Sequence, residues 1–192
     1  MSSIDLQSYA HPILTHVPWP HWVVMGILSL ALTVIILVGK KHSVYCAICL
    51  GLTVFFGLFM LDIAVLIRWG DGVKYMADFS LSAEYHRLIY GGAVRWTEML
   101  ANVAVFLPFG FFLSEFLSST KSLTPHRWLG FVVLCSFCFS LCIEFLQLIL
   151  RLGVCEVTDS VLNTLGGLIG ASLSVVVRII WERGRKKRTT AL

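Results

Sequence analysis

Residues 128–150 read WLGFVVLCSFCFSLCIEFLQLIL, an apolar stretch in which Glu144 is the one residue among Asp, Glu, Lys and Arg. A helix of about 20 apolar residues crosses a hydrocarbon core about 30 Å thick, so this stretch is long enough to span a membrane. The whole chain has the same character, with 57% hydrophobic residues, 14% charged residues and a mean hydropathy of +0.84. The sequence therefore predicts an integral membrane protein.

Four further stretches resemble this one in length and hydropathy, so we predict an all-α membrane protein with five transmembrane helices in one bundle. The predicted spans are Trp22–Gly39, Val44–Ile67, Met99–Leu117, Trp128–Leu150 and Ser160–Trp181. All six tryptophans lie at or just beyond an end of a predicted span, as expected for a residue that prefers the membrane interface. We divide the chain into a two-span hairpin with an external loop at 1–94, a three-helix block at 95–181 and a basic cytoplasmic tail at 182–192.

Positive charge is unequal on the two sides of the predicted bundle. Alternate connecting segments, including the tail, carry 9 Lys and Arg residues on one side and 5 on the other. Because cytoplasmic segments are enriched in Lys and Arg, we predict that the N-terminus is outside and the C-terminus is cytoplasmic. The basic tail is then expected to lie along anionic lipid as a stop-transfer flank. Glu115, near the inner end of the third span and close to Lys121, is expected to be an interfacial charge.

Polar residues recur at helical spacing on the last three spans. The predicted ligand-binding set is Arg95, Glu98 and Asn102 on the third, Glu144, Gln147 and Arg151 on the fourth, and Asp159 and Asn163 on the fifth. Membrane interiors disfavour such groups by a few kcal/mol each or more, so we expect the three stripes to face one polar pocket that opens to the exterior. The competing interpretation is structural, with these side chains forming hydrogen bonds between helices. Gly166, Gly170 and Ser174 form a small-residue seam that is expected to pack against a neighbouring helix.

Other reactive residue types form no recognisable site. Cys46-x-x-Cys49 lies within a predicted span and is interpreted as packing. His11, His16 and His21 are interrupted by prolines, which makes a metal site improbable. The sequence contains no Ser-His-Asp arrangement, HExxH, P-loop or dinucleotide-binding turn. We therefore expect no metal, no cofactor and no nucleic-acid partner.

Three ordered motifs resemble the VanZ-like family of bacterial membrane proteins. They are Glu98-x-x-x-Asn102-Val-Ala-Val-Phe-Leu-Pro108-Phe-Gly110, Ile143-Glu144-Phe-Leu-Gln147 and Asp159-Ser-Val-Leu-Asn163-Thr-Leu-Gly166-Gly-Leu-Ile-Gly170. The resemblance covers about Arg95 to Arg178 and implies a multi-pass protein of the bacterial cytoplasmic membrane. The family takes its name from a member linked to teicoplanin resistance and has no settled biochemical activity. One departure is that Arg151-Leu152-Gly153 stands where the family often has Gly-Arg.

Two hypotheses about function follow. In the first, a non-catalytic envelope protein binds membrane lipids and an amphiphilic or lipid-linked ligand, such as a lipid-linked cell-wall intermediate or a lipoglycopeptide, and contributes to resistance to glycopeptides of the teicoplanin type. In the second, a membrane-embedded enzyme acts on a lipid head group through Glu144 and Asp159, with Arg95 or Arg151 holding phosphate. A transporter is less favoured, because no inverted repeat is visible and the polar stripes stop at mid-membrane.

Overall fold

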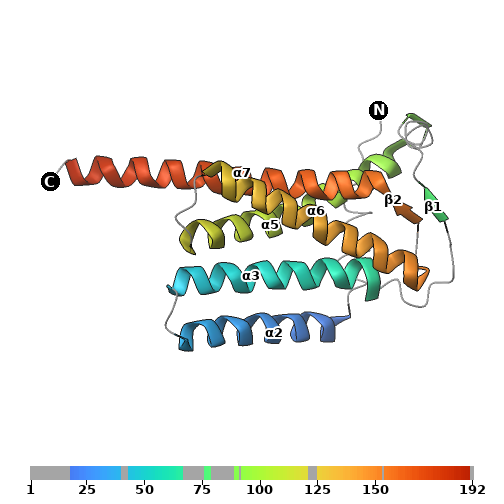
Figure 1. Ribbon diagram of the computed structural model, residues 1–192, viewed down its shortest axis with the longest axis horizontal. Helices are drawn as coiled ribbons and strands as arrows, with labels where there is room; N and C mark the ends of the chain where they lie inside the picture. The colour runs from blue at the N-terminus through green and yellow to red at the C-terminus, as the bar shows by residue number, and fades with distance from the viewer. Residues whose placement is uncertain are drawn as a thin grey trace.

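The computed structural model describes residues 18–39, 43–66, 76–78, 89–90, 92–120, 125–152 and 154–190 (Figure 1). Within these ranges, five helices are long and apolar enough to cross a membrane, which confirms the predicted all-α fold with five spans. They are α2 (Trp19–Val38), α3 (Val44–Leu61), α5 (Gly92–Thr120), α6 (Pro125–Leu150) and α7 (Val157–Thr190). A π-helical turn, η1 (Asp62–Leu66), extends α3, and two short strands, β1 (Met76–Asp78) and β2 (Val154–Glu156), pair in parallel.

Successive helices run in opposite directions, which gives the bundle two distinct ends (Figure 1). The strand end holds β1 and β2, the first residues of α2 and α7, and η1. The tail end holds the last turns of α2, α5 and α7 and the first turns of α3 and α6. Ser43 caps α3 there by accepting a hydrogen bond from the backbone N–H of Cys46 at 3.2 Å. That the strand end faces the exterior stays a prediction.

Helices α5 and α7 pack closely through glycine. Gly110 of α5 faces the backbone of Gly167, and Gly166 and Gly170 of α7 face backbone carbonyl groups of α5. A Cβ atom at Gly110, Gly166 or Gly170 would overlap main-chain atoms of the other helix. The two backbones therefore meet without a layer of side chains between them, as small residues allow in membrane bundles.

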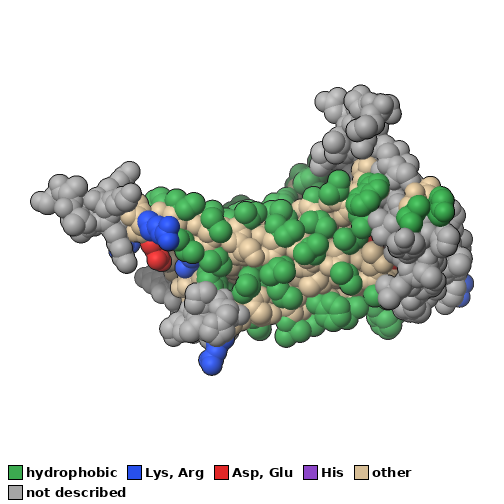
Figure 2. All heavy atoms as spheres, turned by 90° about the horizontal axis from the view of Figure 1, so that it is seen from above, with side chains coloured by type: hydrophobic (Ala, Val, Ile, Leu, Met, Phe, Trp, Pro, Cys, Tyr) green, Lys and Arg blue, Asp and Glu red, His purple; other side chains and the backbone are tan. Residues whose placement is uncertain are grey.

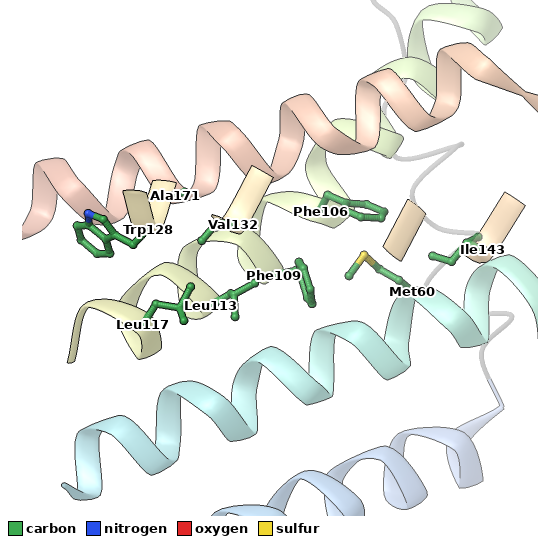
Figure 3. Packing of buried hydrophobic residues seen from close by; sticks show 9 residues of the cluster. All are labelled: Met60, Phe106, Phe109, Leu113, Leu117, Trp128, Val132, Ile143 and Ala171. Carbon is green, nitrogen blue, oxygen red and sulfur yellow. The ribbon is translucent and has the colours of Figure 1, made fainter. Parts of the chain in front are cut away.

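The hydrophobic core lies between α3, α5, α6 and α7. Its buried members are Met60, Phe106, Phe109, Leu113, Leu117, Trp128, Val132, Ile143 and Ala171 (Figure 3). Phenylalanine rings add stacked contacts, with centroids 5.4 Å apart for Phe109 and Phe139. Since lipid is as apolar as these side chains, their close packing stabilises the bundle by dispersion more than by the hydrophobic effect.

Helix α2 lies at the edge of the bundle and packs mainly on α3 (Figure 1). Met25 is its one buried residue. Trp22 packs on Phe59, with ring centroids 5.0 Å apart, and the Ser29 hydroxyl donates a hydrogen bond to the Gly51 carbonyl at 2.6 Å. Apolar side chains are spread along the middle of the face seen in Figure 2, and the described charged side chains on that face lie toward its ends. This surface suits lipid, and the chain is a multi-pass membrane protein.

Candidate functional site

At the strand end, the carboxylate of Glu144 lies at the start of α7. Its Oε2 atom accepts a hydrogen bond from the backbone N–H of Glu156 at 3.1 Å, and the Glu144 side chain is 5% exposed. Glu156 is the last residue of β2 and directly precedes α7. Asp159 lies in the first turn of that helix. Negative charge is favourable here, because the first backbone N–H groups of a helix have no intrahelical acceptor and the helix dipole is positive.

Two amide side chains form hydrogen bonds that connect the same end of α6 to η1 and to α7. Gln147 donates from Nε2 to the carbonyl oxygen of Ala64 in η1 at 3.0 Å. Asn163 of α7 donates from Nδ2 to the hydroxyl of Ser140 at 2.8 Å. A π-helical turn interrupts the regular i to i−4 ladder, so its carbonyl groups can accept bonds from elsewhere. These two bonds join α6 to α3 and to α7, as the structural interpretation of the polar stripes predicts.

The stripe expected on α5 is less buried than those on α6 and α7. Asn102 is half-buried and Glu98 is exposed, while the side chain of Arg95 lies outside the described residues. Gln147 and Asn163 bond to different neighbours rather than to one another. The structure thus brings the polar groups of α6 and α7 to one end, and their common ligand pocket with α5 stays a prediction.

Arg151 ends α6 in an unusual backbone conformation. Its φ angle is +58°, in the left-handed region that glycine adopts most easily. The N–H of Leu152 bonds to the carbonyl of Gln147 at 2.9 Å, and that of Arg151 bonds to the carbonyl of Leu148 at 3.3 Å. This pair of bonds is a Schellman motif with arginine at the position that is usually glycine. Its side chain is exposed at the strand end.

A buried acid and a histidine form a pair that sequence reasoning missed. Asp62 is 2% exposed, and its Oδ1 lies 2.6 Å from Nδ1 of His21 on α2. The other carboxyl oxygen, Oδ2, is buried and has no hydrogen-bond partner in the described part of the chain. The sequence does contain a signal for this pair, because an ionisable residue within a membrane span needs a partner. The first two spans form a hairpin, so that partner is expected on the neighbouring helix. His11 and His16 lie outside the described residues.

Glu115 is the centre of a second buried cluster, at the tail end. It is 3% exposed, so the expectation of an interfacial charge is wrong. Its carboxylate accepts hydrogen bonds from the Tyr45 hydroxyl at 2.5 Å, the Ser174 hydroxyl at 2.7 Å and Arg178 Nη2 at 3.1 Å. The physical reason is that Arg178, one turn after Ser174 on α7, supplies the countercharge within the bundle. Lys121, the expected neighbour, lies outside the described residues.

Further polar contacts beside this cluster bear on the transporter hypothesis. The Ser114 hydroxyl donates to that of Ser174 at 3.0 Å, and Arg178 Nη2 reaches the Ser119 hydroxyl at 3.2 Å. The Arg178 guanidinium carbon lies 5.4 Å from the centre of the Trp128 ring. Buried polar groups therefore occur at both ends of the bundle and do not stop at mid-membrane.

Metal binding has no evident site in the described ranges. No group of three or more His, Cys, Asp and Glu residues there is arranged to hold a metal ion.

Comparison with known proteins gives a family-level match. A family model described as VanZ/LLP1 matches residues 43–178, which include α3 with its π-helical turn, α5, α6 and the part of α7 up to Arg178. "Protein VanZ" of Enterococcus faecium is 34% identical over 76 residues, which is 40% of this chain and 43% of that protein. The match thus spans less than half of the relative's length. No solved structure matches the chain. Helix α2, which supplies His21, lies before the matched residues.

Proposed function

The chain belongs to the VanZ/LLP1 family, and we propose that it is a non-catalytic protein of the bacterial cytoplasmic membrane. In this proposal it binds an amphiphilic or lipid-linked ligand at the strand end. The ligand class comprises lipid-linked cell-wall intermediates and lipoglycopeptides. By holding such a molecule, the protein would contribute to resistance to glycopeptides of the teicoplanin type.

The observation that carries the proposal is the burial of carboxyl groups at one end of a membrane bundle, above all those of Asp62 and Glu144. Asp62 and Glu144 are 2% and 5% exposed. Hydrogen bonds between helices need no ionisable group, and a buried carboxyl group in a membrane protein usually serves a functional site. Asp62 Oδ2 also has no hydrogen-bond partner among the described residues, so it is available to a donor such as a hydroxyl, amide or amine.

The surroundings of this end suit a ligand that is partly apolar. Exposed aromatic side chains occur on the neighbouring segments, including Trp19, Tyr90 and Trp96. Aromatic rings of this kind sit at the membrane interface, where one part of an amphiphile is wet and the other is in lipid. A ligand with a polar head and an acyl chain would match both parts.

Binding to the purified protein in nanodiscs tests the proposal. The probes are lipid II and fluorescently labelled teicoplanin, titrated against the wild type, Asp62→Asn and Glu144→Gln. We expect each variant to bind about tenfold more weakly, since a hydrogen bond to a charged group contributes about 1.5 kcal/mol or more. Glu182→Gln is the matched control, because Glu182 is exposed at the opposite end, and it should bind like the wild type. Absence of binding by the wild type would refute the proposal.

The enzyme hypothesis keeps one supporting observation, since Glu144 and Asp159 both lie at the start of α7. A carboxyl group there could act as an acid or base toward a lipid head group at the membrane surface. Incubation with radiolabelled membrane lipids would detect turnover. The hypothesis requires that Glu144→Gln and Asp159→Asn abolish turnover in folded protein, and it fails if both variants retain full turnover.

A further inference from the structure

Two nitrogen donors at the tail end have no hydrogen-bond partner among the described residues. They are Nε1 of Trp128 and Nε of Arg178, and both atoms are buried. Trp128 as a whole is 5% exposed and lies at the tail end of the core cluster (Figure 3). A buried N–H group without an acceptor is unfavourable, so each such group in a native protein calls for an explanation.

The side chains of the two donors are in contact. The Arg178 guanidinium carbon lies 5.4 Å from the centre of the Trp128 ring, within the range of a cation–π contact. Its hydrogen bonds to described residues all come from Nη2, which reaches Glu115 and Ser119. Nε and Nη1 thus donate no hydrogen bond to the described residues, and the side chain is 30% exposed, which leaves a route of approach for another acceptor.

The charge around this place favours an anion. Trp128 lies in the first turn of α6, where unpaired backbone N–H groups give the helix end a partial positive charge. Arg127 beside it is exposed, and so are Arg183 and Arg185 on α7, with Glu182 as the acidic residue among them. Blue Lys and Arg side chains gather at this end in Figure 2. Since Glu115 already balances the charge of Arg178, these additional arginines make the surface positive.

We propose that Arg178 and Trp128 bind the phosphate group of an anionic membrane lipid at the tail end. A phosphate offers several acceptor oxygens to the planar donor set of arginine, and the indole N–H supplies one further donor. The nearby surface is apolar, with Phe131 at 44% exposure one turn beyond Trp128 on α6 and Leu134 at 56% one turn beyond Phe131. An acyl chain would lie there, which is why a lipid fits this place better than free phosphate. The site is at the opposite end of the bundle from the proposed ligand site and does not depend on it.

Native mass spectrometry of the protein in detergent measures this binding directly, with phosphatidylglycerol as the probe. Trp128→Phe keeps an aromatic ring under the guanidinium group and removes only the N–H donor. We expect its affinity for the first bound lipid to fall about five- to tenfold. Trp181→Phe is the matched control, because it removes an exposed indole N–H from the same end of the bundle, and it should leave the affinity unchanged.

Arg178→Lys is the second variant, since it keeps the charge near Glu115 but loses Nε and the planar donor set. It should also weaken lipid binding at least fivefold, and its thermal unfolding curve shows whether it is folded. Equal affinity in Trp128→Phe and wild type, or equal losses in Trp128→Phe and Trp181→Phe, would overturn the proposal. Displacement of the lipid by inorganic phosphate at the same concentration would assign the site to free phosphate and overturn the lipid assignment.

Discussion

The buried pair of Glu115 and Arg178 makes a quantitative prediction about stability. The Arg178→Gln substitution leaves the Glu115 carboxylate, 3% exposed, with the two hydroxyl donors of Tyr45 and Ser174. Removing one partner of a buried ion pair costs about 3–5 kcal/mol, because the remaining charge has lost its counterion. The Arg178 side chain is 30% exposed, so water and lipid head groups would screen the change, and we expect a loss of about 2–3 kcal/mol.

Reversible unfolding in mixed micelles with increasing dodecyl sulfate, followed by circular dichroism, measures this loss. The double variant Glu115→Gln/Arg178→Gln removes both charges and should recover to within about 1 kcal/mol of the wild type. Arg183→Gln, an exposed arginine on the same helix, should change stability by no more than about 0.5 kcal/mol. The reasoning fails if Arg178→Gln loses less than about 1 kcal/mol, or if the double variant is less stable than Arg178→Gln alone.

The same unfolding assay tests three further predictions. Gly110→Ala should destabilise the protein by about 2 kcal/mol or more, because the added methyl group would overlap the α7 backbone. The control Gly130→Ala has open space at its Cβ and should be neutral or stabilising. Equal effects of the two substitutions would contradict the close packing of α5 and α7. Arg151→Gly should stabilise by about 1 kcal/mol because glycine adopts φ +58° without strain, and Arg151→Ala should show no such gain. His21→Ala should destabilise the protein by about 1–3 kcal/mol, because it removes the partner of the buried Asp62. Adding Asp62→Asn to this variant should restore part of the lost stability. A His21→Ala variant as stable as the wild type would show that the pair is unimportant.

Hydropathy predicted the number and order of the membrane helices because lipid-facing residues must be apolar over the full thickness of the bilayer. It located the helix ends less well. The third predicted span begins at Met99, but α5 begins at Gly92, since the polar first turns of a helix need not lie in lipid. The strands β1 and β2 carry no comparable signal, because three residues are too few for an alternating pattern.

Helical periodicity showed which polar residues share a face, but it could not choose their partners. Glu115 bonds to Arg178, 63 residues later, and His21 bonds to Asp62, 41 residues later. Such pairs depend on how the helices are arranged in space, which the spacing within one helix does not contain. For Glu115, the sequence pointed to Lys121, the nearest positive charge along the chain, and so to an interfacial position. The structure places its countercharge, Arg178, on α7.

The glycine contacts between α5 and α7 limit how this protein can move. Because main-chain atoms are in direct contact, neither helix can slide or rotate about its axis without a steric clash. The two helices should therefore move together as one rigid body within the bilayer. Any displacement that accompanies ligand binding must then be taken up by the remaining segments. Helix α2 lies at the edge of the bundle with Met25 as its one buried residue, so it is the helix best placed to move. Its displacement would separate His21 from the carboxyl group of Asp62.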